Sequence, residues 1–209
     1  MPQGVFAITE QRDGVFRKVS FEAISEGRRI ADGLGADLCA VVVGSGIEGI
    51  AGELQKYGPD KILVADDPAL ADYTTSAYTN VIADLVQSAD AAVVILGASA
   101  QGKDLSARLA ARLDAGLAMD CTAVKLDGGQ LTCTRPMFGG KIFADVEFDS
   151  AIQIVAIRPN VMDITESAKE GAILTVIRSS PPVDAFRSRM QITAHVWFMM
   201  DAIPWHDRV

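Results

Sequence analysis

A strand-to-helix turn at residues 97–103 carries the residue types that hold phosphates in proteins. Gly97, Ser99 and Gly102 are followed by Lys103, and the turn leaves an apolar run to enter a segment of helical spacing. Backbone N–H groups and the helix dipole converge at such a turn, so small residues with a lysine nearby suit an anionic group. An adenine nucleotide, AMP or ATP, is therefore one candidate ligand of this turn.

The same turn also has a purely structural interpretation. Its glycines permit a tight connection, and Asp104 is spaced to pair with Arg108 one helical turn later. Neither the G-x-G-x-x-G motif nor the complete Walker motif is present, because Asp104 follows Lys103 where the Walker motif has Ser or Thr. We therefore favour the structural interpretation, while a second glycine turn, Gly44-Ser45-Gly46, keeps the nucleotide alternative open.

A second group of reactive residue types lies at residues 134–141. A proline and the Gly139–Gly140 pair fix a stiff turn there, from which Arg135, Phe138 and Lys141 project. A basic and aromatic trio suits a protein contact better than catalysis, because no histidine, carboxylate or nucleophile lies nearby in the sequence. The trio is a candidate partner interface, and a structural turn with solvated charges is the alternative.

Few residues here could do catalysis or bind metal. The histidines, His195 and His206, are eleven residues apart, which matches no metal-ligand spacing and no catalytic arrangement. Three cysteines, with no Cys-x-x-Cys pair, support neither a disulfide framework nor a zinc site. We expect no catalytic residue, no metal site and no enzyme activity.

The elements that must position these residues alternate between strand and helix. Continuous apolar runs such as 38–43 and 91–96 are typical of parallel strands covered on both faces. Strands are expected at 4–9, 38–43, 61–65 and 91–96, and helices at 20–34, 47–57, 74–86 and 101–114, the first capped by Ser20. This alternation predicts an α/β fold with a parallel, helix-covered sheet.

After Gly116 the pattern changes to short strands. Residues 119–126 and 130–134 flank a glycine turn and predict a hairpin, and residues 141–148 and 151–157 predict a second strand pair. An antiparallel β annex is therefore expected at about residues 117–158, within an α/β domain spanning residues 1–160.

Composition and charge exclude several classes of protein. With 49% hydrophobic residues the chain can build a core, and its net charge of −8 disfavours nucleic-acid binding. No apolar stretch approaches the ~20 residues of a membrane helix. The amino terminus reads directly into a strand without a leader, so we expect a cytoplasmic protein.

Residues 161–209 form a tail of different composition. No glycine follows Gly171, while both tryptophans and both histidines lie beyond it. Residues 172–177 read as a strand, and residues 190–200 are apolar. The tail either packs on its own chain or docks on a partner, and self-association is one form of such docking.

Four segments together resemble the alpha subunit of electron-transfer flavoproteins. They are the run from Gly97 through Arg-Leu-Ala-Ala-Arg-Leu113, Gly116-Leu-Ala-Met-Asp-Cys121, Thr134-Arg-Pro-Met-Phe-Gly-Gly-Lys141 and Ile157-Arg-Pro-Asn160. The resemblance covers about residues 4–171. It implies a Rossmann-like domain of the adenine-nucleotide-hydrolase-like type, a beta subunit as partner, and transfer of electrons from dehydrogenases through the heterodimer.

The resemblance also has a gap, which concerns the flavin. Alpha subunits of this family hold FAD on glycine- and serine-rich loops of a second domain, and residues 172–209, which contain no glycine, offer no such loop. We therefore carry over no flavin-binding residue and expect this chain alone not to bind FAD. The alternative function is a stand-alone adenine-nucleotide-binding module of the universal-stress-protein type, using Gly97, Ser99, Gly102 and Lys103.

Overall fold

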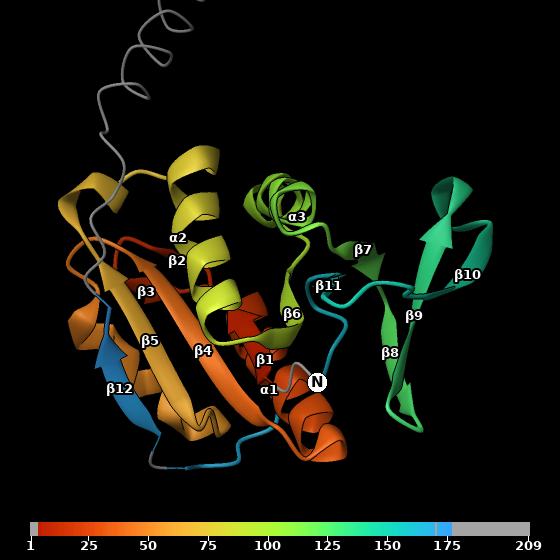
Figure 1. The fold of residues 1–209 in the computed structure, drawn as a ribbon, viewed down its shortest axis with the longest axis horizontal. Coiled ribbons are helices and arrows are strands. Elements are labelled where there is room, and N and C mark those ends of the chain that lie inside the picture. Colours follow the sequence, from red (N-terminus) through yellow and green to blue (C-terminus); the bar gives the residue numbers. More distant parts are fainter. Residues whose placement is uncertain (1–3, 170, 177–209) are drawn as a thin grey trace, which may run out of the picture. The chain divides into compact units, whose positions relative to one another are not determined.

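The fold is built on one seven-stranded sheet in which every neighbouring pair is parallel (Figure 1). The computed structural model describes residues 4–169 and 171–176. The strand order is β12-β5-β4-β1-β6-β11-β7. The strands are β1 (Gly4–Ile8), β4 (Asp37–Gly44), β5 (Lys61–Asp66), β6 (Ala91–Gly97), β7 (Gly116–Cys121), β11 (Gln153–Ile157) and β12 (Ala172–Thr175). The predicted α/β fold with a parallel sheet is confirmed.

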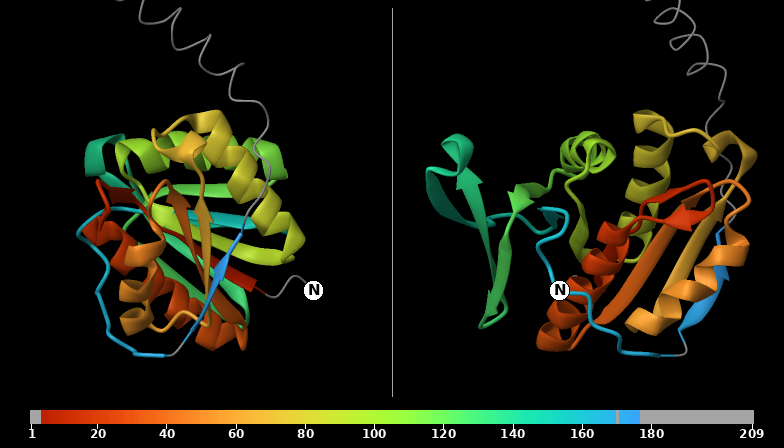
Figure 2. Two further views of the ribbon diagram at one scale, coloured as in Figure 1. Left: turned by 90° about the vertical axis from the view of Figure 1, so that its left-hand side faces the viewer. Right: turned by 180° about the vertical axis from the view of Figure 1, so that it is seen from behind.

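Helices cover both faces of this sheet (Figure 2). On one face lie α1 (Lys18–Leu34) and the 3-10 helix η1 (Glu48–Tyr57), and on the other lie α2 (Thr75–Ser88) and α3 (Ala100–Leu113). Smaller elements are the β2–β3 hairpin (Gln11–Arg12, Val15–Phe16) and η2 (Pro68–Leu70).

The central strands are apolar throughout because both of their faces are buried. In β4, Ala40 and Val42 pack into the core beneath α1, whereas Val41 and Val43 pack into the core beneath α2. Successive side chains of a strand point to opposite faces, so a strand between two helical layers needs apolar residues at every position.

The first helix begins earlier than its sequence predicts, so the prediction of Ser20 as its cap is wrong. The helix starts at Lys18, and its capping residue is Arg17. Ser20 instead exchanges two hydrogen bonds of 2.8 Å with the backbone of Glu10, at the end of β1. A tertiary contact thus uses the hydroxyl that the sequence pattern assigns to a cap.

The antiparallel annex contains three strands. The predicted hairpin across the glycine turn is confirmed, whereas one predicted pairing within residues 117–158 is wrong. The annex consists of β8 (Ala123–Asp127), β9 (Gln130–Met137) and β10 (Ile142–Glu147), with the turn η3 (Phe138–Gly140) between the last two. Residues 119–126 divide between β7 of the large sheet and β8 of the annex.

The wrong pairing concerns β11. It was expected to pair with residues 141–148, but it lies parallel between β6 and β7 in the large sheet. Residues 154–157 are fully buried. The strand is therefore an interior strand of the large sheet, whose continuous apolar run does not distinguish it from one strand of a short hairpin.

Residues 158–169, which we call the strap, cross the face that carries α1 and η1 (Figure 2). Backbone N–H groups of the strap donate to Ser25 Oγ on α1 and to carbonyl oxygens of η1. The strap carries the chain to the opposite edge of the sheet, where β12 pairs with β5. Because β12 lies beyond residue 160, we propose that the α/β domain extends through Thr175 rather than ending at residue 160.

Candidate functional site

The glycine turn predicted as a phosphate cradle lies at the carboxyl end of β6, and its polar groups bond within the chain. Ser99 Oγ accepts the N–H of Gly102 at 3.0 Å and so caps α3. A Cβ on Gly102 would lie 1.8 Å from the carbonyl oxygen of Gly97, so a side chain there would collide with the turn. Gly97, Ser99 and Gly102 are thus brought together, while Lys103 lies exposed on the first turn of α3.

A buried carboxylate occupies the position next to this turn. Ser99 Oγ donates a 2.7 Å hydrogen bond to Oε1 of Glu10. The Glu10 side chain is 5% exposed, its Oε2 has no hydrogen-bond partner, and Arg17 lies 3.5 Å away. Burial raises the pKa of Glu10, and the Ser99 hydroxyl and Arg17 partly offset that rise. A carboxyl group of the chain itself therefore faces the turn where a phosphate would have to bind.

The second glycine turn is also occupied by a carboxylate of the chain. At the end of β4, the N–H groups of Gly46 and Ile47 each donate to the carboxylate of Asp66 at 2.7 Å, and that of Glu48 donates at 3.2 Å. Such a run of converging N–H groups is an anion-binding nest. Here the bound anion is Asp66, at the end of β5.

The side-chain pairing in the helix after the first turn, α3, differs from the one predicted. Asp104 was expected to pair with Arg108, but its carboxylate accepts the hydroxyls of Tyr73, at 2.7 Å, and Thr75. No ion pair of Arg108 occurs among the residues that the structure describes. Asp104 therefore joins α3 to the start of α2 instead of bracing its own helix.

The three residues predicted as a partner interface lie on the β9–β10 hairpin, but in different settings. Phe138 and Lys141 are exposed at the connection between the strands, and Phe138 is 73% exposed. Arg135 is half-buried, and its Nε is buried without a hydrogen-bond partner. The neighbouring Ile142 and Phe143 are 50% and 65% exposed. Sequence reasoning missed their exposure, because alternation along a strand predicts that one of two adjacent side chains is buried.

Two contacts that sequence reasoning missed involve residues from the segments of the sequence resemblance. Arg158 makes a bidentate ion pair with Asp120, at 2.6 and 3.0 Å, and so joins β11 to β7. Glu22, fully buried on α1, accepts the N–H of Asn160 with both carboxylate oxygens. These residues therefore fix the start of the strap against the sheet and α1.

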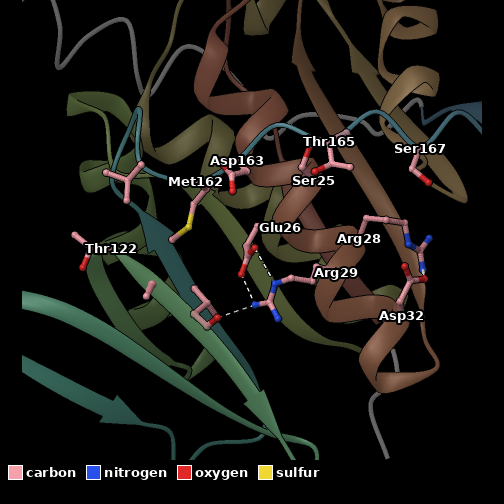
Figure 3. Close-up of a pocket in the computed structure, with 13 residues that line it drawn as sticks. Ser25, Glu26, Arg28, Arg29, Asp32, Thr122, Met162, Asp163, Thr165 and Ser167 are labelled. Carbon is pink, nitrogen blue, oxygen red and sulfur yellow. Dashed lines mark hydrogen bonds and ion pairs between the residues drawn. The ribbon is translucent and has the colours of Figure 1, made fainter.

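A groove of about 540 Å³ lies between α1, β8 and the strap (Figure 3). Arg29 pairs with Glu26 in the groove and donates to the Val124 carbonyl oxygen at 2.7 Å, while Arg28 pairs with Asp32. Since these charged groups bond to each other, the groove is best described as the junction of three elements. Nothing in the sequence spacing indicates it.

The prediction that the chain has no metal site concerns some residues that lie outside the described ranges. Within residues 4–169 and 171–176, no group of three His, Cys, Asp or Glu side chains is placed to hold a metal ion. His195, His206 and the apolar run at 190–200 lie outside the described residues. Of the helices in the described ranges, none has the length and apolar character needed to cross a bilayer.

Comparison with known proteins gives a consistent result. The model of the "Electron transfer flavoprotein domain" matches residues 5–181. The chain is 44% identical to "Protein FixB" of Clostridium saccharobutylicum, over 77% of this chain and 49% of that protein. It is also similar to "Electron transfer flavoprotein subunit alpha" of two bacteria. Identity is 40% for the Clostridium acetobutylicum protein (77% of this chain, 49% of the relative) and 39% for the Bacillus subtilis protein (84% and 54%). The chain thus spans about half the length of these relatives, and the comparisons give no support to a universal-stress-type module.

Proposed function

The chain belongs to the electron transfer flavoprotein family, and we propose that it serves as an alpha-type subunit, or part of one, that supports electron transfer from dehydrogenases through a heterodimer with a beta subunit. The observation that carries this proposal is the match to alpha subunits and FixB proteins over three quarters or more of the chain. We further propose a non-enzymatic role, in which the domain is a scaffold for redox partners.

The described domain does not suit the family's flavin at the carboxyl ends of its parallel strands, where such a ligand would bind. FAD carries a pyrophosphate, and both turns that could bind one face carboxylates of the chain, Asp66 and Glu10. A phosphate at either turn would meet a carboxyl group of the chain and backbone donors that are already bonded. We therefore propose that residues 4–176 bind neither FAD nor AMP or ATP, and that Gly97, Ser99 and Gly102 have a structural role.

We propose that the β9–β10 hairpin contributes to the contact with the beta subunit. Phe138 and Lys141 are exposed there, and aromatic and basic side chains are common anchors of protein interfaces. A contact between this hairpin and the beta subunit is consistent with a chain whose role depends on that subunit. The cytoplasmic location and any self-association through the tail, residues 161–209, stay predictions.

Co-purification tests this function. The full chain carrying an affinity tag is expressed with the beta-type electron transfer flavoprotein subunit of the same genome, and the eluate is analysed by light scattering. A one-to-one complex is the expected result. Separate elution of the two chains at micromolar concentration would contradict the proposal, since a working subunit must associate with its partner.

A further inference from the structure

The end of the β9–β10 hairpin exposes three large apolar side chains in six residues. Phe138, Ile142 and Phe143 are 73%, 50% and 65% exposed. A few other large apolar side chains are also exposed in the described ranges, but they are scattered or lie close to the ends of those ranges. Clustered exposure of this kind marks a surface that another molecule covers. We call residues 135–144 the hairpin tip.

The tip exposes apolar groups on both faces of the hairpin. Phe143 is paired with Pro136, and the adjacent Ile142 is paired with Met137. Because successive residues of a strand point to opposite faces, Phe143 and Ile142 lie on opposite sides. Nearer the body of the protein the side chains of the hairpin are covered. Cys133 is fully buried, and Val146, its partner in β10, packs against the core. The tip therefore projects beyond the core (Figure 1).

The backbone at the tip holds Phe138 in an unfavourable conformation. Phe138 has φ +50°, and Gly139 and Gly140 follow with φ +68° and +86°. The left-handed region suits glycine or asparagine and is costly for a bulky side chain. Residues kept in such a conformation are found mainly where function requires the side chain.

Charge at the tip opposes that of the whole chain. Residues 134–144 contain Arg135 and Lys141 and no acidic residue, whereas the chain has a net charge of −8. Lys141 makes no ion pair within the described ranges, and Arg135 has an unpartnered Nε. A surface that covers the tip would be complementary if it carried carboxylates.

We propose that the hairpin tip inserts into an apolar cleft with an acidic rim on the partner beta-type subunit. A cleft, unlike a flat surface, covers both faces of a projecting hairpin, and acidic side chains at its rim would pair with Lys141 and Arg135. A second copy of this chain fits less well, because the groove of Figure 3 is lined mainly by polar and charged side chains. This inference rests on the proposed function and specifies its contact surface.

Binding of the full chain to the purified beta-type subunit, measured by titration calorimetry, tests the inference. Phe138→Gly removes the phenyl group and relieves the left-handed strain, so the variant should unfold at the same temperature as the wild type or a higher one. Its affinity should fall at least about tenfold, as for an anchor residue. Phe143→Thr, which replaces the phenyl group with a smaller residue of high strand propensity, should weaken binding further in the double variant.

Two further variants complete the design. Lys141→Glu should weaken binding most at low salt, because it places a carboxylate at an acidic rim. Val15→Thr is the matched control: Val15 is 67% exposed on the distant β2–β3 hairpin, so its affinity should equal that of the wild type.

The outcomes separate this inference from the proposed function. If the wild-type chain does not bind the beta-type subunit, the proposed function fails and the inference with it. If the wild type binds and Phe138→Gly and Phe143→Thr bind equally well, the hairpin-tip inference alone is overturned. It is also overturned if light scattering finds a homodimer that Phe138→Gly dissociates, because the cleft would then belong to a second copy.

Discussion

Ser99 and Glu10 are 89 positions apart in the sequence, yet the hydroxyl of the first donates a 2.7 Å hydrogen bond to the buried carboxylate of the second. This bond joins the amino terminus of α3 to the segment that follows β1. Both lie at the carboxyl ends of the parallel strands, where α/β folds bind ligands. Because Ser99 also caps α3, one side chain serves both the helix and the carboxylate. This end of the sheet is thereby organised around the carboxylate of Glu10, which belongs to the chain itself.

The Ser99→Ala substitution should destabilise the fold by about 2–4 kcal/mol. It removes a helix cap, which contributes about 1 kcal/mol, and leaves Oε1 of the buried Glu10 without its donor, at a cost of about 1–3 kcal/mol. Urea denaturation gives the difference. Ser88→Ala is the matched control: Ser88 bonds its own helix at Leu85 and should change stability by less than about 0.5 kcal/mol. Equal effects of the two substitutions would argue against the role of Ser99.

Glu10→Gln should make stability less dependent on pH. The pKa of Glu10 is raised in the folded protein, mainly by burial, so the folded state keeps this proton more tightly than the unfolded state. Wild-type stability should therefore decrease as pH rises from the ordinary glutamate pKa through the raised value, and the variant should lack this decrease. Melting temperatures from pH 4 to pH 8 test this. A variant less stable than the wild type at pH 7 and equally stable at pH 4 would contradict it.

Asp60 should have the opposite pH dependence. Burial opposes its ionisation, but hydrogen bonds from Lys169, the Leu38 N–H and Arg28 outweigh burial and lower the pKa to about 2. The stabilisation is complete above pH 4, the ordinary aspartate range, and is lost as pH falls towards 2. Asp60→Asn should cost about 2 kcal/mol at pH 7 and little at pH 2. A cost that is the same at both pH values would show that the charge of Asp60 is unimportant.

Asp66→Ala should create a weak anion site. Removal of the carboxylate leaves the N–H groups of Gly46 and Ile47 without an acceptor, which should cost about 1–3 kcal/mol. Phosphate, added at constant ionic strength, should restore part of the lost melting temperature by binding the free nest. The wild type should not respond. A similar phosphate response of both proteins would mean that Asp66 does not fill the nest.

The alternation of strand and helix could be predicted because it depends on local patterns. The run at 38–43 is apolar at every position because both of its faces are covered, and Gly35 ends α1 with φ +63°, as glycine does after helices. β11 was misassigned because its buried run is equally compatible with a hairpin strand. Its place in the sheet depends on the strands beside it, which lie far away in the sequence.

The site could be predicted only in part, for a similar reason. The glycine turn and the exposed Phe138 follow from local residue types. The carboxylates that close the two turns, Glu10 and Asp66, come from other strands, and no spacing links Glu22 to Asn160 across 138 positions. Whether a turn is open to a ligand is thus a property of the tertiary structure.

The most direct test of the account is the visible spectrum of the purified full chain after incubation with excess FAD and removal of free flavin. We predict no retained flavin absorption, because the turns that suit a pyrophosphate in the described domain hold Asp66 and Glu10. Stoichiometric flavin with resolved absorption bands would contradict the account.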